Sequence, residues 1–374
     1  MLDIIAASIA LPKGAEVIVR RPHQAKCRRP SVSVVIPCYN YGRYLDECVQ
    51  SVLDQQDVNV DIVIVDDASS DGSAVVVKHL VDQDERVRAI CHEKNIGHIA
   101  TYNEGLAQAT GDYTVLLSAD DLLTPGCLAR ATSLMEAYPS VGMTYGFAAT
   151  CSDDERPRAR TKAKGWVIWN GRSWIADRCR SGHNVLRSPE AVMRTSVLRE
   201  IGTHYRSDLP HTGDFEMWMR AATVSDIAYI YGADQAYYRI HESNMHHSAF
   251  DLLADMAGRL RAFDTIFSER ADLLSDAESL RDTAHRTLAV EALSHGISAY
   301  TRGVAGEQPV DEYVAFAVET YPDVKQLRDW RVLVSLQRTS GRSARHNLPL
   351  IVRERKRSAR YALNWRRWRW AGVY

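Results

Sequence analysis

Apolar residues in the first third of the chain alternate between two spacings. Short β-branched runs at 31–37 and 60–65 predict buried strands, while apolar residues three and four apart at 43–53 predict a helix. The alternation continues to residue 138. It predicts strands at 87–91 and 113–117 and helices at 73–81, 98–109 and 125–138. Strands and helices of these lengths predict an α/β fold, with right-handed βαβ units and a mostly parallel sheet between helices.

The rest of the chain changes in character twice. A further strand is expected at 141–149, and the charged stretch 150–182 is typical of an exposed, irregular insertion, with regular structure resuming near Pro189. From about residue 250 the pattern is helical, which predicts a C-terminal helical appendage. We expect an N-terminal extension at 1–30 and an α/β domain at 31–245, divided into parts at 31–125 and 126–245. A helical region at 246–341 and a basic aromatic tail at 342–374 are expected to follow.

Charge is distributed unevenly along the 374 residues. The formal net charge is −1, which by itself argues against a general nucleic-acid binder. However, residues 1–30 carry six basic and two acidic side chains, and residues 342–374 carry ten basic and one acidic. The 311 residues between them therefore have a net charge of −14. An acidic body with two basic ends predicts two kinds of partner.

The cysteines and the apolar runs indicate in which cellular compartment the protein is expected. Seven cysteines, with no Cys-x-x-Cys pair, argue against a zinc ribbon or a fully paired disulfide framework and favour a reducing compartment. The apolar run near Met1 includes Asp3 and lacks a clear cleavage site, so we expect no signal peptide. Because no stretch reaches 18 apolar residues, no transmembrane helix is expected. We therefore expect a cytoplasmic protein.

Polar residues follow three of the expected strands, where ligands bind in open parallel sheets. They are Tyr39-Asn40, Asp66-Asp67 and Asp120-Asp121. Each has a purely structural interpretation, as a turn or as the cap of the following helix. Acidic pairs at two strand ends of one sheet edge are harder to explain that way, because close carboxylates repel one another. A divalent cation such as Mg²⁺ or Mn²⁺, bridging substrate phosphates, is the natural partner for them.

Several ordered motifs in this region carry a resemblance to a known family. The segments SVSVVIPCYNYGRYLDECVQSVLDQ, DIVIVDDASSDGS and NIGHIATYNEGLAQATGDYTVLLSADDLLTPGCL look like the nucleotide-sugar half of family 2 glycosyltransferases. The resemblance covers about residues 31–245 and implies the GT-A fold. It also implies that 31–125 binds the nucleotide sugar and that 126–245 faces the acceptor.

The resemblance implies roles for individual residues on the donor side. The turn Pro37–Tyr39 with Asn40 would pack against the nucleotide base, Asp67 would accept a hydrogen bond from it, and Asp66 would shape that loop. Ser118-Ala119-Asp120 resembles the DXD triplet, in which Asp120 would hold the metal ion and the donor diphosphate. The remaining donor-lining residues implied by the resemblance are Asn95 and Asn103. Two positions depart from the family pattern, Ser118 in place of Asp and Tyr102 in place of a basic residue.

On the acceptor side, the resemblance implies that Asp214 is the catalytic base. The alternative is that Asp214 only caps a helix at 215–222, and Glu216 is the nearest competitor for the base. His241 follows the last expected core strand and would complete the metal shell or contact the diphosphate. A lone histidine is as readily explained by a structural role.

Together these features predict an inverting glycosyltransferase that moves a sugar from a nucleoside-diphosphate sugar to a hydroxyl in envelope polysaccharide or glycolipid synthesis. Alternatives are a soluble small-molecule or protein acceptor, and a non-catalytic nucleotide- or glycan-binding module of the same fold. A nucleotidyltransferase is disfavoured because PCYNYGRYL is not a glycine-rich basic loop. We expect a divalent cation, Mg²⁺ or Mn²⁺, as cofactor.

The tail at 353–370 interleaves eight basic residues with aromatic ones, including three tryptophans in six residues. That mixture suits the headgroup region of an anionic membrane, which predicts peripheral contact with the inner face of the cell membrane and a lipid-linked or glycan acceptor. Docking on the protein's own acidic body or in a homodimer is the next interpretation, and nucleic-acid binding is the least favoured.

Overall fold

The computed structural model describes residues 15–18, 29–202, 204–241, 244, 251–339 and 348–371, with side chains in all of these except 15–18 and 367–371. The expectations for the apolar run near Met1, for Cys27 and for the last tryptophans lie outside these described residues and side chains. The chain divides into two compact units. The first runs to Trp174 and resumes at Val185, and the second holds Ile175–Asn184 and the helices from α9 onward.

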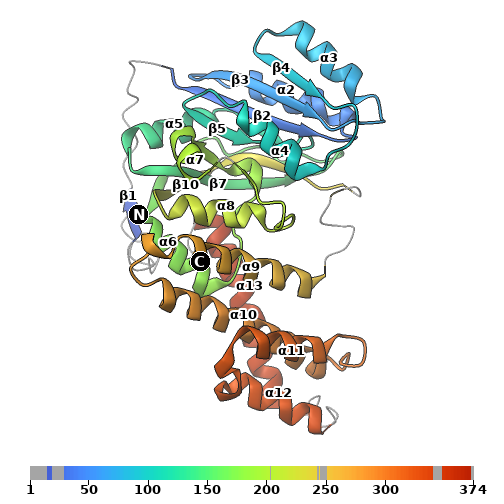
Figure 1. The fold of residues 1–374 in the computed structure, drawn as a ribbon, viewed down its shortest axis with the longest axis vertical. Coiled ribbons are helices and arrows are strands. Elements are labelled where there is room, and N and C mark those ends of the chain that lie inside the picture. The colour runs from blue at the N-terminus through green and yellow to red at the C-terminus, as the bar shows by residue number, and fades with distance from the viewer. Residues whose placement is uncertain are drawn as a thin grey trace. The chain divides into compact units, whose positions relative to one another are not determined.

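The described residues of the first unit form a sheet of ten strands, whose arrangement Figure 1 shows. The spatial order is β1-β8-β10-β7-β9-β5-β2-β3-β4, and β6 pairs with β10. The strands are β1 (Ala15–Ile18), β2 (Ser31–Cys38), β3 (Asn59–Asp66), β4 (Val87–Cys91), β5 (Tyr113–Leu116), β6 (Leu122–Leu123), β7 (Val141–Cys151), β8 (Gly165–Trp169), β9 (Val192–Arg194) and β10 (Asp226–Arg239). Pairing is parallel from β5 to β4 and between β7 and β10, and antiparallel elsewhere. The parallel half carries the predicted βαβ units.

Helices cover both faces of the parallel half. They are α2 (Gly42–Leu53), α3 (Ser73–Gln83), α4 (His98–Ala107) and α5 (Cys127–Ala137). Successive side chains of a strand point to opposite faces, so Val34 and Ile36 join the core formed with α2, α3 and α5. Val35 faces α4, where a Cβ on Gly105 would lie 2.3 Å from Val35 Cγ1. The strands are therefore apolar on both faces because both are covered.

The expectation of an irregular stretch at 150–182 is wrong for its second half. Gly165–Trp169 forms β8, which pairs with β10 and buries Trp166 and Trp169. Helix α6 (Gly171–Ser181) follows directly. Regular structure thus resumes well before Pro189. The four apolar residues at 166–169 are sufficient to form a buried strand although the sequence before them is highly charged.

The remaining helices of the first unit are short. They are η1 (Ser188–Glu190), α7 (Thr195–Ile201) and α8 (Gly213–Ala222). Helix α8 begins at Gly213 with Thr212 before it, so Asp214 lies in the first turn and is not the N-cap. The cap interpretation of Asp214 is therefore wrong, and its carboxylate is left for other contacts.

The second unit is helical, as expected for the C-terminal part. Its elements are α9 (Leu252–Glu269), η2 (Ala271–Leu273), α10 (Ala277–Arg302), α11 (Val310–Thr320), η3 (Pro322–Gln326), α12 (Arg328–Arg338) and α13 (Leu348–Ala371). They share a core of their own, which includes Met256, Leu293 and Leu333. The tail belongs to this unit, because Arg353 pairs with Asp329 at 2.5 Å and Arg357 donates to the Ser294 carbonyl at 3.0 Å. Through these two arginines, α13 packs against the other helices of the second unit.

Candidate active site

The turn after β2 is held by the loop after β3. Asn40 adopts a left-handed backbone, with φ of 59°, and its Oδ1 accepts from the Ser70 amide at 2.8 Å. Asp66 is buried and accepts from the Ser69 hydroxyl at 2.5 Å, while that hydroxyl oxygen accepts from the Asn40 amide at 2.9 Å. Pro37 lies in β2 beside Val65, and Tyr39 is 49% exposed. The two loops thus fix each other and leave the Tyr39 ring accessible.

Asp67 is the most heavily bonded carboxylate on this edge. Its Oδ1 accepts from His92 Nδ1 at 2.8 Å and from the Ile96 amide at 2.8 Å, and its Oδ2 accepts from the Gly97 amide at 3.0 Å. Burial raises the pKa of Asp67, but these hydrogen bonds outweigh burial and lower it overall. With the Thr101 side chain, four groups of the protein therefore bond to Asp67, which matches the roughly four lone-pair positions of a carboxylate.

The two asparagines predicted to line the donor site have local partners. Asn95 Nδ2 donates to the Asp67 carbonyl at 3.3 Å, and its Oδ1 accepts from the Gly97 amide at 3.1 Å. Asn103 exchanges two hydrogen bonds with the backbone of Tyr205, at 2.9 and 2.6 Å. Asn95 therefore shapes the Asp67 loop, and Asn103 ties α4 to the chain before α8.

Asp120 and His241 meet at the end of the sheet. Asp120 Oδ2 lies 3.0 Å from His241 Nε2, and their side chains are only 8% and 5% exposed. The Asn244 amide also reaches Asp120 Oδ2, at 3.4 Å. Ala119 is fully buried, and Ser118 is half-buried, with its carbonyl accepting from the Asp121 amide at 3.0 Å in a turn. Within the described part of the chain, no cluster of three or more His, Cys, Asp or Glu side chains is able to hold a metal ion.

Arg239 anchors this end of β10. Its Nε donates to the Asp120 carbonyl at 2.9 Å, and its guanidinium pairs with Glu47 at 2.6 Å and Asp153 at 3.1 Å. Its amide donates to Asp121 Oδ1 at 2.9 Å. Burial raises the pKa of Asp121 well above its ordinary value, and the neighbouring charge of Asp120 raises it further. The second aspartate of the pair is thus a structural group.

Asp214 lies at the start of α8 beside two hydroxyl groups. Ser188 Oγ donates to Asp214 Oδ2, and a hydrogen bond joins Asp214 to Tyr205. Burial raises the pKa of Tyr102, and the charges of Asp214 and Asp120 raise it further. Tyr102 is therefore within electrostatic reach of both candidate site carboxylates. Glu216, the competitor for the base, is buried and paired with Arg220 at 2.9 Å.

His92 and Arg239 are site residues that the sequence interpretation missed. His92 follows β4 directly, at the same sheet edge, and its Nε2 contacts Glu104 at 2.7 Å. The sequence analysis considered the residues that follow β2, β3 and β5. The same examination of the residues that follow β4 would have identified His92. Arg239 ends β10. The sequence feature that could have identified it is a charged residue directly after the two tyrosines at the end of an expected strand.

Comparisons with known proteins agree with this geometry. Residues 33–202 match the family described as glycosyl transferase family 2. An uncharacterised glycosyltransferase of Haemophilus influenzae is 25% identical over 214 residues, which cover 57% of this chain and 66% of that protein. Bacillus subtilis TuaG, provisionally named a teichuronic acid biosynthesis glycosyltransferase, is 38% identical over 93 residues, covering 25% of this chain and 37% of TuaG. The chain thus spans less than two thirds of the length of these relatives.

A solved structure extends the likeness beyond the matched segment. The crystal structure of S. aureus TarS 1–349 in complex with UDP-GlcNAc superposes with a TM-score of 0.57, at 18% identity, over 83% of this chain and 92% of that chain. At this identity the likeness concerns the fold, and it confirms the expected α/β GT-A architecture with C-terminal helices. Through its residues 33–202, the chain is similar to glycosyl transferase family 2.

Proposed function

We propose that the protein is an inverting glycosyltransferase that moves a sugar from a nucleoside-diphosphate sugar to a hydroxyl of a cell-envelope glycan. The observation that carries this proposal is a pair of buried or half-buried carboxylates, Asp120 beside His241 and Asp214 beside Ser188, whose charges both raise the pKa of Tyr102. One carboxylate has a histidine beside it and the other has hydroxyl partners, so their environments suit different tasks. Relatives named for envelope polymers support the acceptor class.

The donor would lie along the carboxyl ends of β2, β3 and β5. The exposed Tyr39 ring offers an apolar face to the base, and Asp67, directly after β3, would accept a hydrogen bond from a base N–H in exchange for one from its present partners. Asp120 and His241 fit a divalent cation, because carboxylate and imidazole ligands suit Mn²⁺ and because such ions commonly take one or two protein ligands and complete their shell with substrate phosphates. When bound, the ion would neutralise charge on the departing diphosphate.

Asp214 would take the proton from the attacking hydroxyl of the acceptor. A general base must be oriented toward that proton, and the hydrogen bonds of Asp214 with the Ser188 hydroxyl and with Tyr205 hold its carboxylate in a fixed orientation. Glu216 is unsuited to this role, since its carboxylate is 1% exposed and neutralised by Arg220. Attack opposite the departing diphosphate would invert the anomeric carbon.

The test is nucleoside-diphosphate release from a panel of UDP- and GDP-sugars with Mn²⁺ and envelope glycan acceptors. Asp214→Asn is expected to lower turnover by about 10²- to 10⁴-fold while donor affinity stays within twofold. Asp120→Asn is expected to weaken donor binding as well. Asp46→Asn, an exposed aspartate on α2, is the matched control and keeps full activity. Full turnover in Asp214→Asn, or release that never depends on a glycan acceptor, would contradict the proposal.

Peripheral membrane contact through α13 is the proposed location of this activity. No helix among the described residues is long and apolar enough to cross a membrane. The side of α13 that carries Val352, 41% exposed, and Leu363, 56% exposed, is flanked by basic side chains that are also exposed, namely Arg355, Lys356, Arg360 and Arg366. Apolar and cationic side chains on one face suit the headgroup region of an anionic bilayer.

Vesicle sedimentation tests this location. The full chain is expected to pellet with phosphatidylglycerol-containing vesicles, less so at high salt, and to stay in solution with purely zwitterionic vesicles. Replacing Arg355, Lys356, Arg360 and Arg366 with Gln should abolish pelleting. Lys78→Gln, an exposed lysine on α3, is the control. Unchanged pelleting of the fourfold variant would refute a role for α13.

A further inference from the structure

A basic segment, residues 156–164, follows β10 away from the active-site end of the sheet. Next to this segment, Asp153 pairs with Arg239, and at its far end the Lys164 amide donates to the Tyr231 carbonyl at 2.8 Å. Between them the Asp234 amide donates to the Arg160 carbonyl at 2.7 Å. The segment therefore runs antiparallel to β10 over about 20 Å, counted as six residue steps of strand from Tyr231 to Tyr237, whose hydroxyl donates to the Pro157 carbonyl at 2.8 Å.

Basic residues occupy every second position of this segment. Ala159 and Ala163 pack against the core of the first unit, while the alternate positions are exposed and basic, namely Arg156, Arg158, Arg160, Lys162 and Lys164. Arg156 is neutralised by Glu47 and Arg160 by Asp234, at 2.5 Å. The other three have no carboxylate partner within the described residues. An extended chain with three unneutralised cations is a surface that attracts anions.

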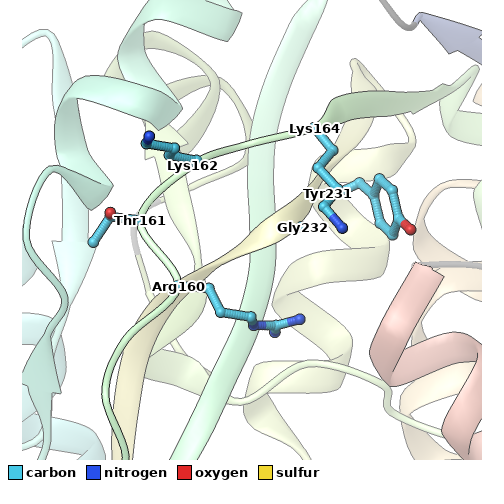
Figure 2. Close-up of a pocket in the computed structure, with 6 residues that line it drawn as sticks. All are labelled: Arg160, Thr161, Lys162, Lys164, Tyr231 and Gly232. Carbon is cyan, nitrogen blue, oxygen red and sulfur yellow. The ribbon is translucent and has the colours of Figure 1, made fainter.

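The far end of the segment opens on a cavity of about 530 Å³. Its lining consists of Arg160, Thr161, Lys162, Lys164, Tyr231 and Gly232 (Figure 2), so none of the lining residues is acidic. Figure 2 shows Arg160 and Lys164 directed toward the side where the Tyr231 ring lies, and Lys162 directed to the other side of the segment. The cavity thus combines an aromatic face with an ammonium group that has no carboxylate partner among the residues that the structure describes.

The backbone at Gly232 leaves room for the side chain of Lys164. Gly232 has φ of 86°, and a Cβ there would lie 2.7 Å from Lys164 Cγ. It lies within the register shift between Tyr229 and Asp234, where the β7–β10 pairing is irregular. Only glycine allows both the left-handed backbone and the close passage of the lysine stem.

We infer that this cavity binds an acidic unit of a glycan, one that carries a carboxylate or a phosphate group. Lys164 contacts the anionic group, and the Tyr231 ring packs against the sugar, because an aromatic face suits the apolar face of a pyranose. Arg158 and Lys162 provide further cations for neighbouring anionic units of the same polymer. That the cavity serves as an acceptor subsite rests on the proposed function, whereas its binding of an acidic glycan does not.

The test is equilibrium binding of three fluorescent oligomers of equal length to the full chain at low salt. They are an oligogalacturonate, an oligomer of glycerol phosphate and a neutral dextran oligomer. At least one acidic oligomer is expected to bind tenfold or more tightly than dextran, and the preferred one identifies carboxylate or phosphate as the ligand group. Equal affinity for all three overturns the inference.

Variants locate the binding to the cavity. Lys164→Gln is expected to weaken acidic-oligomer binding about tenfold and Tyr231→Leu several-fold, whereas Lys162→Gln has a smaller effect because it faces away from Tyr231. Lys78→Gln on α3 is the matched control. Unchanged affinity in Lys164→Gln refutes the site. Nucleoside-diphosphate release without added glycan should be unchanged in these variants, so failure of oligomer binding is separable from failure of glycosyl transfer.

Discussion

His92 connects two carboxylates at the edge of the proposed donor site. Burial lowers the pKa of His92, but the hydrogen bonds that its ring donates to Asp67 and Glu104 outweigh burial and raise the pKa above 6.5. A histidine with a raised pKa in the folded protein stabilises the fold fully below its unfolded pKa. That contribution is lost as the pH rises from about 6.5 through the raised value. The loop that positions Asp67 is therefore held more firmly on the acid side of neutrality.

We predict that His92→Gln lowers the free energy of unfolding by about 1 kcal/mol below pH 6.5 and by progressively less at higher pH. Urea denaturation of both proteins at intervals from pH 5.5 to 9 measures the difference. Titrations common to both proteins cancel in that difference. A gap that is constant with pH, or that widens toward alkaline pH, would refute the ionic role of His92.

Asn103 offers a sharper test, because the sequence and the structure suggest different roles. The family resemblance predicts a donor-lining residue, whereas the two hydrogen bonds to Tyr205 hold the chain that contacts Asp214. We predict that Asn103→Ala lowers kcat at least tenfold and leaves donor affinity within twofold. Steady-state kinetics with donor binding by calorimetry separates the two. A loss confined to donor affinity would support the sequence-based role instead.

Glu216 and Arg220 form a buried ion pair on α8 whose value is structural. Arg220 also donates to the carbonyls of Ile201 and Gly202, both at 3.1 Å, so its charge holds the α7 end against α8. We predict that Glu216→Gln costs about 3 kcal/mol of stability, because it leaves a buried guanidinium without its counter-charge. Chemical denaturation measures the loss, and donor affinity of the folded fraction should be unchanged. A stable variant without activity would instead favour Glu216 as the base.

At the scale of elements, helix α4 is positioned by a glycine. The Cα of Gly105 approaches the sheet so closely that a Cβ would lie 2.3 Å from Val35 Cγ1 and 3.1 Å from Val65 Cγ2. Both valines are fully buried on central strands, so neither has room to move. This close approach sets the helix that carries Tyr102 and Asn103 against the site.

We predict that Gly105→Ala destabilises the protein by about 1–3 kcal/mol, even though alanine is the better helix former. Combining it with Val35→Ala should recover part of the loss, because the second change removes the clashing methyl groups. Gly306→Ala is the matched control, since a Cβ there meets nothing within 4 Å. Thermal denaturation of the four proteins is the measurement, and a neutral Gly105→Ala would contradict the packing argument.

The elements show which features were predictable from sequence. Strands β2 to β5 and helices α2 to α5 fall within a few residues of the predicted ranges, because their apolar spacing is long and regular. Strand β8 was missed because WVIW is short and stands in charged text. The pairing of Asp120 with His241 joins residues 121 positions apart, and periodicity contains no information on such contacts. The resemblance to a family suggested both residues, but only the fold brings them together.

At the scale of the whole molecule, the net charge of −1 combines separately located charges. Cations accumulate on α13 of the second unit and along the basic segment of the first, while carboxylates cluster at the sheet edge. The expected boundaries near 245 and 341 fall among residues that the structure does not describe, so they stay predictions. What the structure adds is that each unit has its own apolar core.

Because each unit has its own core, a destabilising substitution in one core is expected to affect that unit alone. Leu333 on α12 is fully buried and faces Gly296 on α10, so Leu333→Ala opens a cavity in the second unit. We predict a loss of about 2–5 kcal/mol in the stability of that unit, seen as faster amide exchange in α10, α11 and α12. Exchange in β2, β3 and β5 should not change, and donor affinity should persist. Val318→Ala, on the exposed side of α11, is the control. If exchange accelerated equally in the strands, the two cores would unfold as one, and the helices would be part of the structural support of the donor site.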